Sequence, residues 1–240
     1  MPKKLNVQPE PDQVERPRPS AEAVDFDYVG LLDFQAPKIA AQRRSIESRA
    51  RIIAEASEAF MTRGYESVST HDVSAAAGVT QGLITYHFKS KEGLWQAAMD
   101  RVFGDFRNSL AARIRELQGV GDRTFLKEVI RHVVGLEVQF PSIVRFMVES
   151  GKHADSHLIW LLRRHIRPIY EVMTHIFEVG QRKGVLRPLP LTNAYYVLLT
   201  AGSIFSLEDE IRLVAGWSTR SEPFVEAHVA CLVGMLMTDP

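Results

Sequence analysis

The stretch from His71 to Trp95, HDVSAAAGVTQGLITYHFKSKEGLW, is the feature that most constrains how this chain folds. It contains two short helical patterns separated by Gly78, followed by a third pattern that begins at Ser90. Very short helices are unstable alone, because nucleating a helix costs more free energy than a few hydrogen bonds return. Neighbouring helices must therefore hold them by packing, and we expect a tight turn between the first two.

Helical periodicity continues before this stretch and within it. From Ser45 onward, apolar or small residues recur at three- and four-residue spacing until Gly64, where a glycine favours a helix end. Thr70, Thr80 and Ser90 are suited to cap three helices, because their hydroxyl oxygens can accept a hydrogen bond from a free backbone N–H. The pattern predicts helices over 45–63, 72–77 and 81–87, and one from 91 to beyond 110.

The rest of the chain also has helical periodicity. Pro141 is placed to begin a helix, where a missing N–H is harmless, whereas Pro168 lies inside a long pattern and should kink or divide it. No alternating pattern of strand length has turn residues on both sides. We therefore expect an all-α chain with further helices near 124–138, 142–150, 154–183, 192–215 and 222–237.

Composition bounds the class of protein. The chain has 240 residues, of which 45% are apolar, so it can bury a substantial core. It has no apolar run long enough to span a membrane and no apolar stretch at the N-terminus that suggests a secretory signal. The single cysteine, Cys231, lies among apolar neighbours, and we expect it to be buried and unreactive in a reducing cytoplasm.

Charge gives a local signal rather than a global one. The formal net charge is zero, so the chain as a whole is not attracted to nucleic acid. Residues 1–37 are rich in acids and proline, whereas residues 38–51 carry five basic side chains, Lys38, Arg43, Arg44, Arg49 and Arg51, against one acid, Glu47. The composition of the first segment is typical of a loosely attached tail, although its apolar residues between 26 and 34 would also suit a docking segment.

A short helix, a turn at Gly78 and a second short helix form a helix-turn-helix. In such a unit the second helix lies in the major groove of DNA, and only its first turns need to reach the bases. The helix over 81–87 carries hydrogen-bonding side chains and a glycine on its expected outer face: Gln81, Gly82, Thr85, Tyr86 and His87. The stretch therefore predicts a DNA-binding unit.

Residues 51–95, RIIAEASEAFMTRGYESVSTHDVSAAAGVTQGLITYHFKSKEGLW, resemble the DNA-binding domain of the TetR (tetracycline-repressor-like) family. The most specific part is GVTQGLITYHFKSKEGL, a turn glycine followed by a short helix that ends in Tyr-X-Phe-X-Ser-Lys-Glu. The resemblance implies a three-helix helix-turn-helix domain followed by a larger helical domain for ligand binding and dimerisation. We expect a tail over 1–42, the DNA-binding domain over 43–90 and the second domain over 91–240.

The resemblance also implies roles for individual residues at DNA. Gln81, Gly82 and Thr85 would face base edges. The flanking groups would contact the sugar-phosphate backbone, and an arm preceding the first helix would enter the minor groove. The expected DNA-binding residues are Arg43, Arg44, Thr70, Thr80, Gln81, Gly82, Thr85, Tyr86, His87 and Lys91. For the two arginines and for His87, a solvated surface role is the alternative, and His71 is more simply an exposed polar residue.

Family membership further implies a homodimer, whose two recognition helices would occupy the half-sites of a palindromic operator. The helices near 192–215 and 222–237 each have an apolar face, and four such helices from two protomers would form a bundle. The alternative is that both are core helices of a monomer. The faces are formed by Tyr195, Leu198, Leu199, Gly202, Phe205 and Ser206, and by Val225, His228, Val229, Leu232, Val233 and Leu236.

A small-molecule effector would bind between the helices that cover residues 100–183. Aromatic and methionine side chains there suit an apolar or aromatic ligand, although each is also an ordinary core residue. Three polar residues are placed to face inward, and Arg145 among them would suit an acid or a phenol. The expected ligand-binding residues are Phe103, Phe106, Arg145, Phe146, Glu149, Trp160, Tyr170, Met173, His175 and Phe177, with Phe140 and Met147 as further candidates.

The leading functional hypothesis is a dimeric repressor released from its operator by that effector. A regulator switched by a protein partner, or an activator, is the alternative. Paired carboxylates, a Ser-His-Asp arrangement and a phosphate-binding glycine loop are not visible, so we expect no enzymatic activity and no cofactor. Glu149, His153 and His157 have helical spacing for a metal, but the glycine between them favours a surface role, and we expect no metal site.

Overall fold

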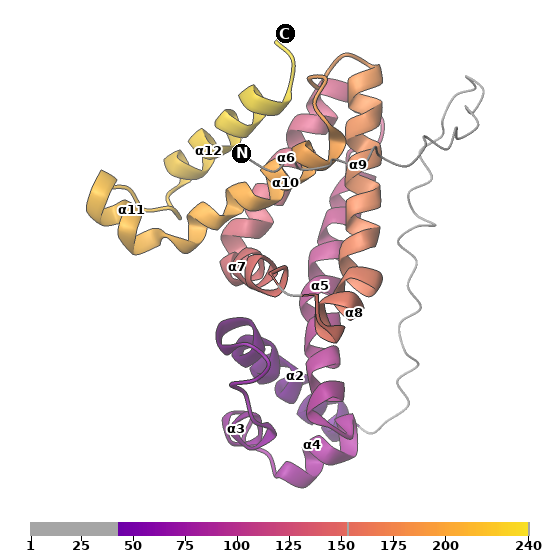
Figure 1. The fold of residues 1–240 in the computed structure, drawn as a ribbon, viewed down its shortest axis with the longest axis vertical. Helices are drawn as coiled ribbons and strands as arrows, with labels where there is room; N and C mark the ends of the chain where they lie inside the picture. The colour runs from indigo at the N-terminus through magenta and orange to yellow at the C-terminus, as the bar shows by residue number, and fades with distance from the viewer. Residues whose placement is uncertain (1–42, 153, 240) are drawn as a thin grey trace, which may run out of the picture.

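The computed structural model describes residues 43–152 and 154–239, with the side chains of Arg43 and Arg44 outside the described part (Figure 1). Within these ranges the chain is helical, and its extended pairing is limited to one isolated bridge between Leu186 and Met237. The elements are α2 (Arg43–Arg63), α3 (Thr70–Ala76), α4 (Gln81–Phe88), α5 (Lys91–Glu116), α6 (Asp122–Gln139), α7 (Pro141–Ser150), α8 (Ser156–Leu161), η1 (Leu162–Ile166), α9 (Arg167–Arg182), α10 (Leu191–Ala201), η2 (Gly202–Ser206), α11 (Glu208–Ala215) and α12 (Glu222–Leu236).

The long helix α5 joins two groups of helices (Figure 1). Helices α2, α3 and α4 surround its N-terminal end. Helices α6, α9 and α10 belong to the other, larger group, and α12 lies at the outer edge of that group. The expected all-α class, with an N-terminal helix-turn-helix and a larger helical C-terminal part, is confirmed. None of the helices in the described part is both long enough and apolar enough to cross a membrane.

The start of α3 differs by one residue from the expectation. Ser69, rather than Thr70, is the N-cap, and its Oγ accepts a hydrogen bond from the backbone N–H of Asp72 at 3.0 Å. The Asp72 carboxylate accepts one in return from the N–H of Ser69 at 3.3 Å. This reciprocal capping box selects Ser69, because the acid stands three residues after it. Thr70 is therefore the first residue of the helix.

The other two caps differ from each other. Ser90 caps α5 as expected, since its Oγ accepts a hydrogen bond from Gly93 N at 3.0 Å. Thr80 occupies the N-cap position of α4, but its side chain makes no capping hydrogen bond, so that part of the expectation was wrong. The turn before α4 depends instead on Gly78, whose φ of +61° lies in the left-handed region that glycine adopts without strain.

The helix expected over 154–183 is divided at Pro168, as predicted. Helix α8 leads into a π-helical turn, η1, and α9 begins at Arg167 with the proline in its first turn. Proline there has no N–H to donate to the preceding turn, and the wider π turn accommodates the lost hydrogen bond. The effect is to let α8 turn toward α5 while α9 runs beside it (Figure 1).

The single helix expected over 192–215 is wrong, because Gly202 begins a tighter 3₁₀ segment that separates α10 from α11. Tyr195, Leu198 and Phe205 from its predicted apolar face are buried within this protomer. The second expected helix is confirmed as α12, but Cys231 is exposed, so the prediction of a buried cysteine was wrong. Cys231 precedes the buried Leu232, and because successive side chains of an α-helix point about 100° apart, Cys231 lies outside the buried face of α12.

Candidate functional site

Helix α4 presents a polar face because its apolar residues anchor it from beneath. Ile84 and Phe88 are buried, with 2% and 6% of their surfaces exposed, whereas Gln81, Gly82, Thr85 and Tyr86 are exposed. This split leaves hydrogen-bonding side chains along the outer side of a rigidly packed short helix. A surface of this kind suits the edges of bases, since those edges present donors and acceptors in the major groove.

The base-facing candidates are held in place by contacts between α3 and α4. The side-chain amide of Gln81 donates to Thr70 Oγ1 at 3.3 Å, and Thr85 Oγ1 donates to the Gln81 carbonyl oxygen at 3.5 Å. Thr70 therefore orients Gln81 as well as standing near the start of α3. A Cβ added to Gly82 would meet one atom within 4 Å, Thr80 Oγ1 at 4.0 Å, so the glycine leaves open space on the outer face.

The end of α4 carries a basic residue that the sequence analysis did not select. Lys89 has a φ of +68°, and its Nζ donates to the Tyr86 carbonyl oxygen at 3.0 Å while lying 5.7 Å from the Tyr86 ring centroid. The Tyr86 side chain is 67% exposed. Lys89 thus stands beside the expected phosphate contact, and its position directly after the recognition helix was the available signal.

His87 is less exposed than Tyr86, which precedes it on α4. Its Nε2 atom is buried and has no hydrogen-bond partner in the described part of the chain. Burial lowers the pKa of His87, and the nearby positive charges of Arg49 and Lys89 lower it further. The imidazole is therefore neutral at pH 7, and it would approach a phosphate as an N–H donor rather than as a cation.

Lys91 has partners inside the protein. Its Nζ donates to the Glu66 carbonyl oxygen at 3.3 Å and lies 4.3 Å from the centroid of the Tyr65 ring. The side chain is half-buried at the start of α5. Lys91 therefore ties the loop after α2 to α5, in addition to lying at the helix end where a phosphate contact was expected.

An aromatic cluster connects this unit to α8. The His157 ring lies 4.1 Å from the Tyr65 ring and 4.4 Å from the Trp95 ring, and its Nε2 is 2.7 Å from Glu92 Oε2. His157 is thus part of the joint between the two helical groups. Of the other two residues with helical spacing for a metal, Glu149 pairs with Lys152 at 2.7 Å, and His153 lies outside the described residues.

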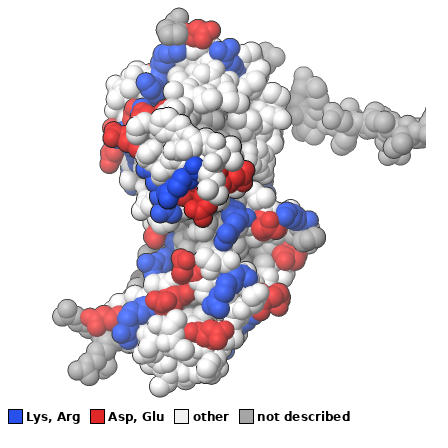
Figure 2. Space-filling view, turned by 90° about the vertical axis from the view of Figure 1, so that its left-hand side faces the viewer, with Lys and Arg blue, Asp and Glu red and all other residues white. Residues whose placement is uncertain are grey.

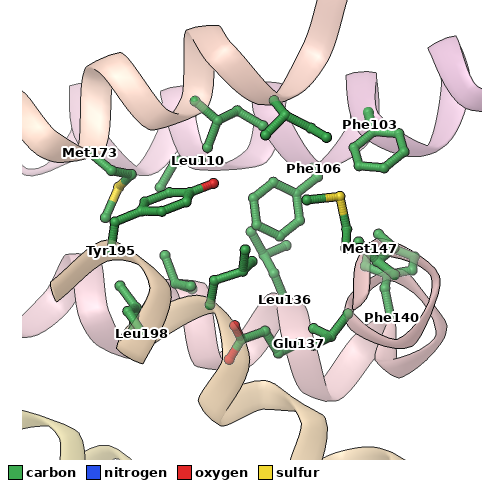
Figure 3. Close-up of a pocket in the computed structure, with 16 residues that line it drawn as sticks. Phe103, Phe106, Leu110, Leu136, Glu137, Phe140, Met147, Met173, Tyr195 and Leu198 are labelled. Carbon is green, nitrogen blue, oxygen red and sulfur yellow. The ribbon is translucent and has the colours of Figure 1, made fainter. Parts of the chain in front are cut away.

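A cavity lies between the helices of the larger group (Figure 3). The cavity has a volume of about 40 Å³, which is room for about three waters at ~10–15 Å³ each. Tyr195 extends its hydroxyl across the cavity toward Phe106. The walls are formed by Phe103, Phe106, Leu110, Val133, Leu136, Glu137, Phe140, Ile143, Val144, Met147, Ile166, Ile169, Met173, Tyr195, Leu198 and Leu199.

The cavity contains some of the aromatic and methionine residues expected to bind a ligand. Phe103, Phe106 and Met173 lie in its walls, together with Phe140 and Met147.

Four other expected apolar residues lie elsewhere. Phe177 is fully buried in the core, and Trp160 packs 5.2 Å from Trp95 at the joint. Tyr170 bonds Thr192 Oγ1 at 2.8 Å through its hydroxyl, and Phe146 packs 6.4 Å from Phe103. They support the cavity walls or the joint without lining the cavity.

The expected polar residues do not reach the cavity. Arg145 and Glu149 are exposed on the outer side of α7, and His175 lies near Glu178 at 3.8 Å on α9. On a short helix, the inward positions went to Ile143, Val144 and Met147, so Arg145 and Glu149 had to face solvent. The expectation of an acid or phenol held by Arg145 was therefore wrong for this cavity.

The polar group that does line the cavity is Glu137, which the sequence analysis missed. Its surface is 2% exposed, and neither carboxyl oxygen has a hydrogen-bond partner in the described part of the chain. Burial raises its pKa from 4.5 to about 9, so the carboxyl is protonated at pH 7. The signal was available, because Glu137 follows the buried Ile130, Val133 and Val134 at helical spacing on α6.

Gly202 provides the space that Glu137 occupies. A Cβ at Gly202 would lie 2.4 Å from Glu137 Cδ and 2.6 Å from Oε2, closer than any real Cβ contact. Figure 3 shows the Glu137 carboxyl turned toward the ribbon of α10 and η2, where this glycine stands. The end of α10 is therefore shaped around the carboxyl group.

Two walls of the cavity belong to helices that also contact the N-terminal unit. Helix α7 packs against α2, and α5 packs against both α2 and α4. Displacement of either wall would therefore be transmitted to the helix-turn-helix through direct packing.

Comparisons with known proteins agree with this geometry. Residues 52–98 match the model of the family described as bacterial regulatory proteins, tetR family. The chain is 27% identical over 164 residues to the HTH-type transcriptional regulatory protein RaaS of Mycobacterium tuberculosis (strain ATCC 25618 / H37Rv), covering 68% of this chain and 71% of that one.

Two further proteins extend the similarity. The HTH-type transcriptional repressor DhaR of Mycobacterium sp. (strain GP1) is 22% identical over 143 residues, covering 58% of this chain and 72% of its own. The solved structure of a TetR transcriptional regulator from Chloroflexus aurantiacus J-10-FL shares the fold, with a TM-score of 0.60 and 20% identity over 82% of this chain and all of that one. The helix-turn-helix over residues 52–98 is therefore that of the TetR family of DNA-binding transcriptional regulators, the relatives matched over most of the chain are HTH-type transcriptional regulators, and the solved structure has the same fold.

Proposed function

We propose that the protein is a dimeric repressor, released from a palindromic operator when an apolar or aromatic small molecule binds the cavity. The observation that carries this proposal is the position of the cavity, because its walls α5 and α7 pack directly against the DNA-binding helices. The name of the relative DhaR, a transcriptional repressor, supports repression over activation. We assign residues 43–90 to DNA binding and 91–240 to effector binding and dimerisation.

At the operator, Gln81, Gly82 and Thr85 would face base edges, and Tyr86, with its neighbour Lys89, would contact the backbone. Their exposure on α4 supports this assignment. Thr70, Thr80, His87 and Lys91 would contribute flanking contacts, and Arg43 and Arg44 would form the arm in the minor groove.

The dimer would form on the side of α11 and α12, where the chain exposes large apolar residues. Leu213 and Val214 are 86% and 83% exposed, and Trp217 and Met235 are each about half exposed. Figure 2 shows this side of the molecule, whose upper part has a broad uncharged area with charged side chains at its margins, whereas lysine, arginine and acidic residues intermingle over its lower part. Large exposed apolar patches are typical of interfaces, and burial in a dimer would remove them from water.

Release of the operator on effector binding would follow from the small size of the cavity. The present space holds only a few waters, so a larger ligand must push the walls apart. Such a ligand favours a conformation with displaced α5 and α7, and a change in the separation of the two recognition helices would lower operator affinity.

The test begins with the operator, selected from random DNA by the full chain. Gln81→Ala should weaken operator binding by about 1–3 kcal/mol and relax the preference at one base pair, without changing the unfolding free energy. Glu58→Ala, on the exposed side of α2, is the matched control. Equal loss in both variants would contradict the assigned reading role of α4.

The effector part is tested by thermal shift with a library of apolar and aromatic compounds, followed by operator binding with each hit. Release by a compound that also stabilises the protein supports the proposal. Compounds that stabilise the protein and tighten operator binding would favour an activator. If no compound binds and a partner protein is needed for release, the alternative of a partner-switched regulator would hold.

A further inference from the structure

Glu137 gives the proposed effector cavity a chemical preference. Glu137 is the one acidic or basic side chain among the described residues that line the cavity. The phenol of Tyr195 is the other titratable group there, and burial raises its pKa, so it stays neutral at pH 7. No arginine, lysine or histidine in the described part of the chain lines the same space. An anionic ligand would therefore find no counter-charge there, whereas a cation would find a carboxyl group.

The carboxyl group also lacks a partner, which a cation would supply, as an N–H donor in the case of an amine and as a counter-charge in the case of a quaternary ammonium ion. Both oxygens are buried without a hydrogen-bond partner in the described residues, and an unsatisfied buried polar group is unfavourable. Gly202 keeps the position open for the carboxyl, because any larger residue would occupy it. An orphaned acid in a space shaped for it is better explained by a ligand partner than by packing, for which an apolar residue would serve.

The rest of the wall is suited to an organic cation with an apolar body. Phe103, Phe106, Phe140 and Tyr195 surround the space with aromatic rings, whose faces attract positive charge. Met147 and Met173 have flexible side chains that can move aside for a ligand larger than the present cavity.

We propose that the effector is an apolar organic cation, an amine or a quaternary ammonium compound, and that Glu137 is the residue that binds its charge. This inference rests on the proposed function of the cavity. Binding converts the protonated carboxyl into a carboxylate, so the Glu137 proton leaves to solvent as the cation enters. The complex then contains one buried pair of opposite charges.

Release of one proton gives binding a defined pH dependence. Below the Glu137 pKa of about 9, the affinity for a permanent cation should rise about tenfold for each pH unit, and it should level off above that pKa. On the elements packed against α6, His228 of α12 has a pKa lowered by burial and is already neutral above pH 7. Neither His228 nor Tyr195 therefore titrates between pH 7 and pH 8.

The experiment compares two probes of the same shape, benzyltrimethylammonium and its uncharged counterpart neopentylbenzene. Their Kd values are measured on the full chain between pH 6 and pH 8 by calorimetry, and operator release is measured in parallel. We expect the cation to bind about tenfold tighter per pH unit, with one proton released, and the neutral compound to show no pH dependence.

Two variants assign the effect. Glu137→Gln keeps the shape of the neutral carboxyl, so it should fold, bind neopentylbenzene as before, lose cation affinity by on the order of 100-fold at pH 8 and lose the pH dependence. Glu149→Gln, at an exposed glutamate on α7, should change neither probe. Unchanged cation binding in Glu137→Gln would overturn the inference.

The two proposals fail differently. If the neutral compound binds and releases the operator while the cation does not bind, the effector cavity stands and the cation preference is wrong. If neither probe binds the wild-type protein at any pH, the inference is overturned, and the compound library then decides the proposed function by itself. Cation binding without operator release would support the role of Glu137 and contradict the role of the cavity as the switch.

Discussion

The helix-turn-helix and the cavity treat their polar groups in opposite ways. On α4, Gln81 and Thr85 are exposed and already joined to neighbouring groups by hydrogen bonds, while the apolar residues beneath them are buried. In the cavity, Glu137 is buried and has no partner in the described residues. The first arrangement holds a preformed surface for a large polar ligand. The second arrangement leaves the buried Glu137 carboxyl without a partner, and a small ligand can supply one.

The two regions share α5, so the largest expected effect comes from a substitution that damages their joint. Trp95 is 1% exposed and packs against Tyr65, His157 and Trp160. Trp95→Ala should lower the unfolding free energy by about 3–5 kcal/mol, because it leaves a large void among aromatic rings. Urea unfolding measures this loss. A loss below about 1 kcal/mol would show that the joint contributes little to stability.

The buried carboxyl of the cavity should make the unfolding free energy depend on pH, an effect that the exposed residues of α4 do not have. Glu137 binds its proton up to about pH 9 in the folded state, whereas in the unfolded chain it loses it near pH 4.5. Its contribution is therefore fully present below pH 4.5 and is lost as pH rises through about 9. Within that window the unfolding free energy should fall by up to about 1.4 kcal/mol per pH unit. Urea unfolding of wild type and Glu137→Gln at several pH values should show this slope in the difference between their unfolding free energies.

A glycine in each region, Gly202 beside the cavity and Gly82 on α4, should respond differently to substitution by alanine. Gly202→Ala should lower the unfolding free energy by about 1–3 kcal/mol, because the added Cβ overlaps the Glu137 carboxyl. Gly82→Ala meets open space and should raise stability by about 0.5–1 kcal/mol through better helix propensity, while weakening operator binding. Thermal unfolding and operator titration of both variants measure this. The same stability change in both would remove the distinction between a packed glycine and an exposed one.

The smallest expected effect concerns the lysines beside α4. Lys89→Ala and Lys91→Ala should each lower the slope of log affinity against log salt by about one unit if each side chain neutralises one phosphate. Because Lys91 also contacts Tyr65 and the Glu66 carbonyl oxygen, its variant should in addition lose a few tenths of a kcal/mol of stability. An unchanged salt slope for Lys91→Ala, with that stability loss, would leave it a purely structural residue.

The helix-turn-helix and most helix boundaries could be predicted from the amino-acid sequence. The signals there are local: Gly78 supplies the turn, Ser90 caps α5, and Pro168 divides a helix because it lacks an N–H. Local hydrogen bonding and backbone sterics act over a few residues, so the identities of neighbouring residues are enough to predict these turns, caps and helix breaks. The one-residue difference at Ser69 shows the limit, since two adjacent hydroxyl residues competed for the same cap.

The set of residues that meet in the cavity could not be predicted from the sequence, because it depends on how the helices pack. Glu137, Gly202 and Tyr195 come from separate helices, and no local pattern says that a carboxyl on α6 lies against a glycine at the end of α10. The same packing exposed Cys231 and turned Arg145 and Glu149 outward. A helical period shows that a residue is on an apolar face, but the neighbouring helices determine whether that face borders core, cavity or solvent.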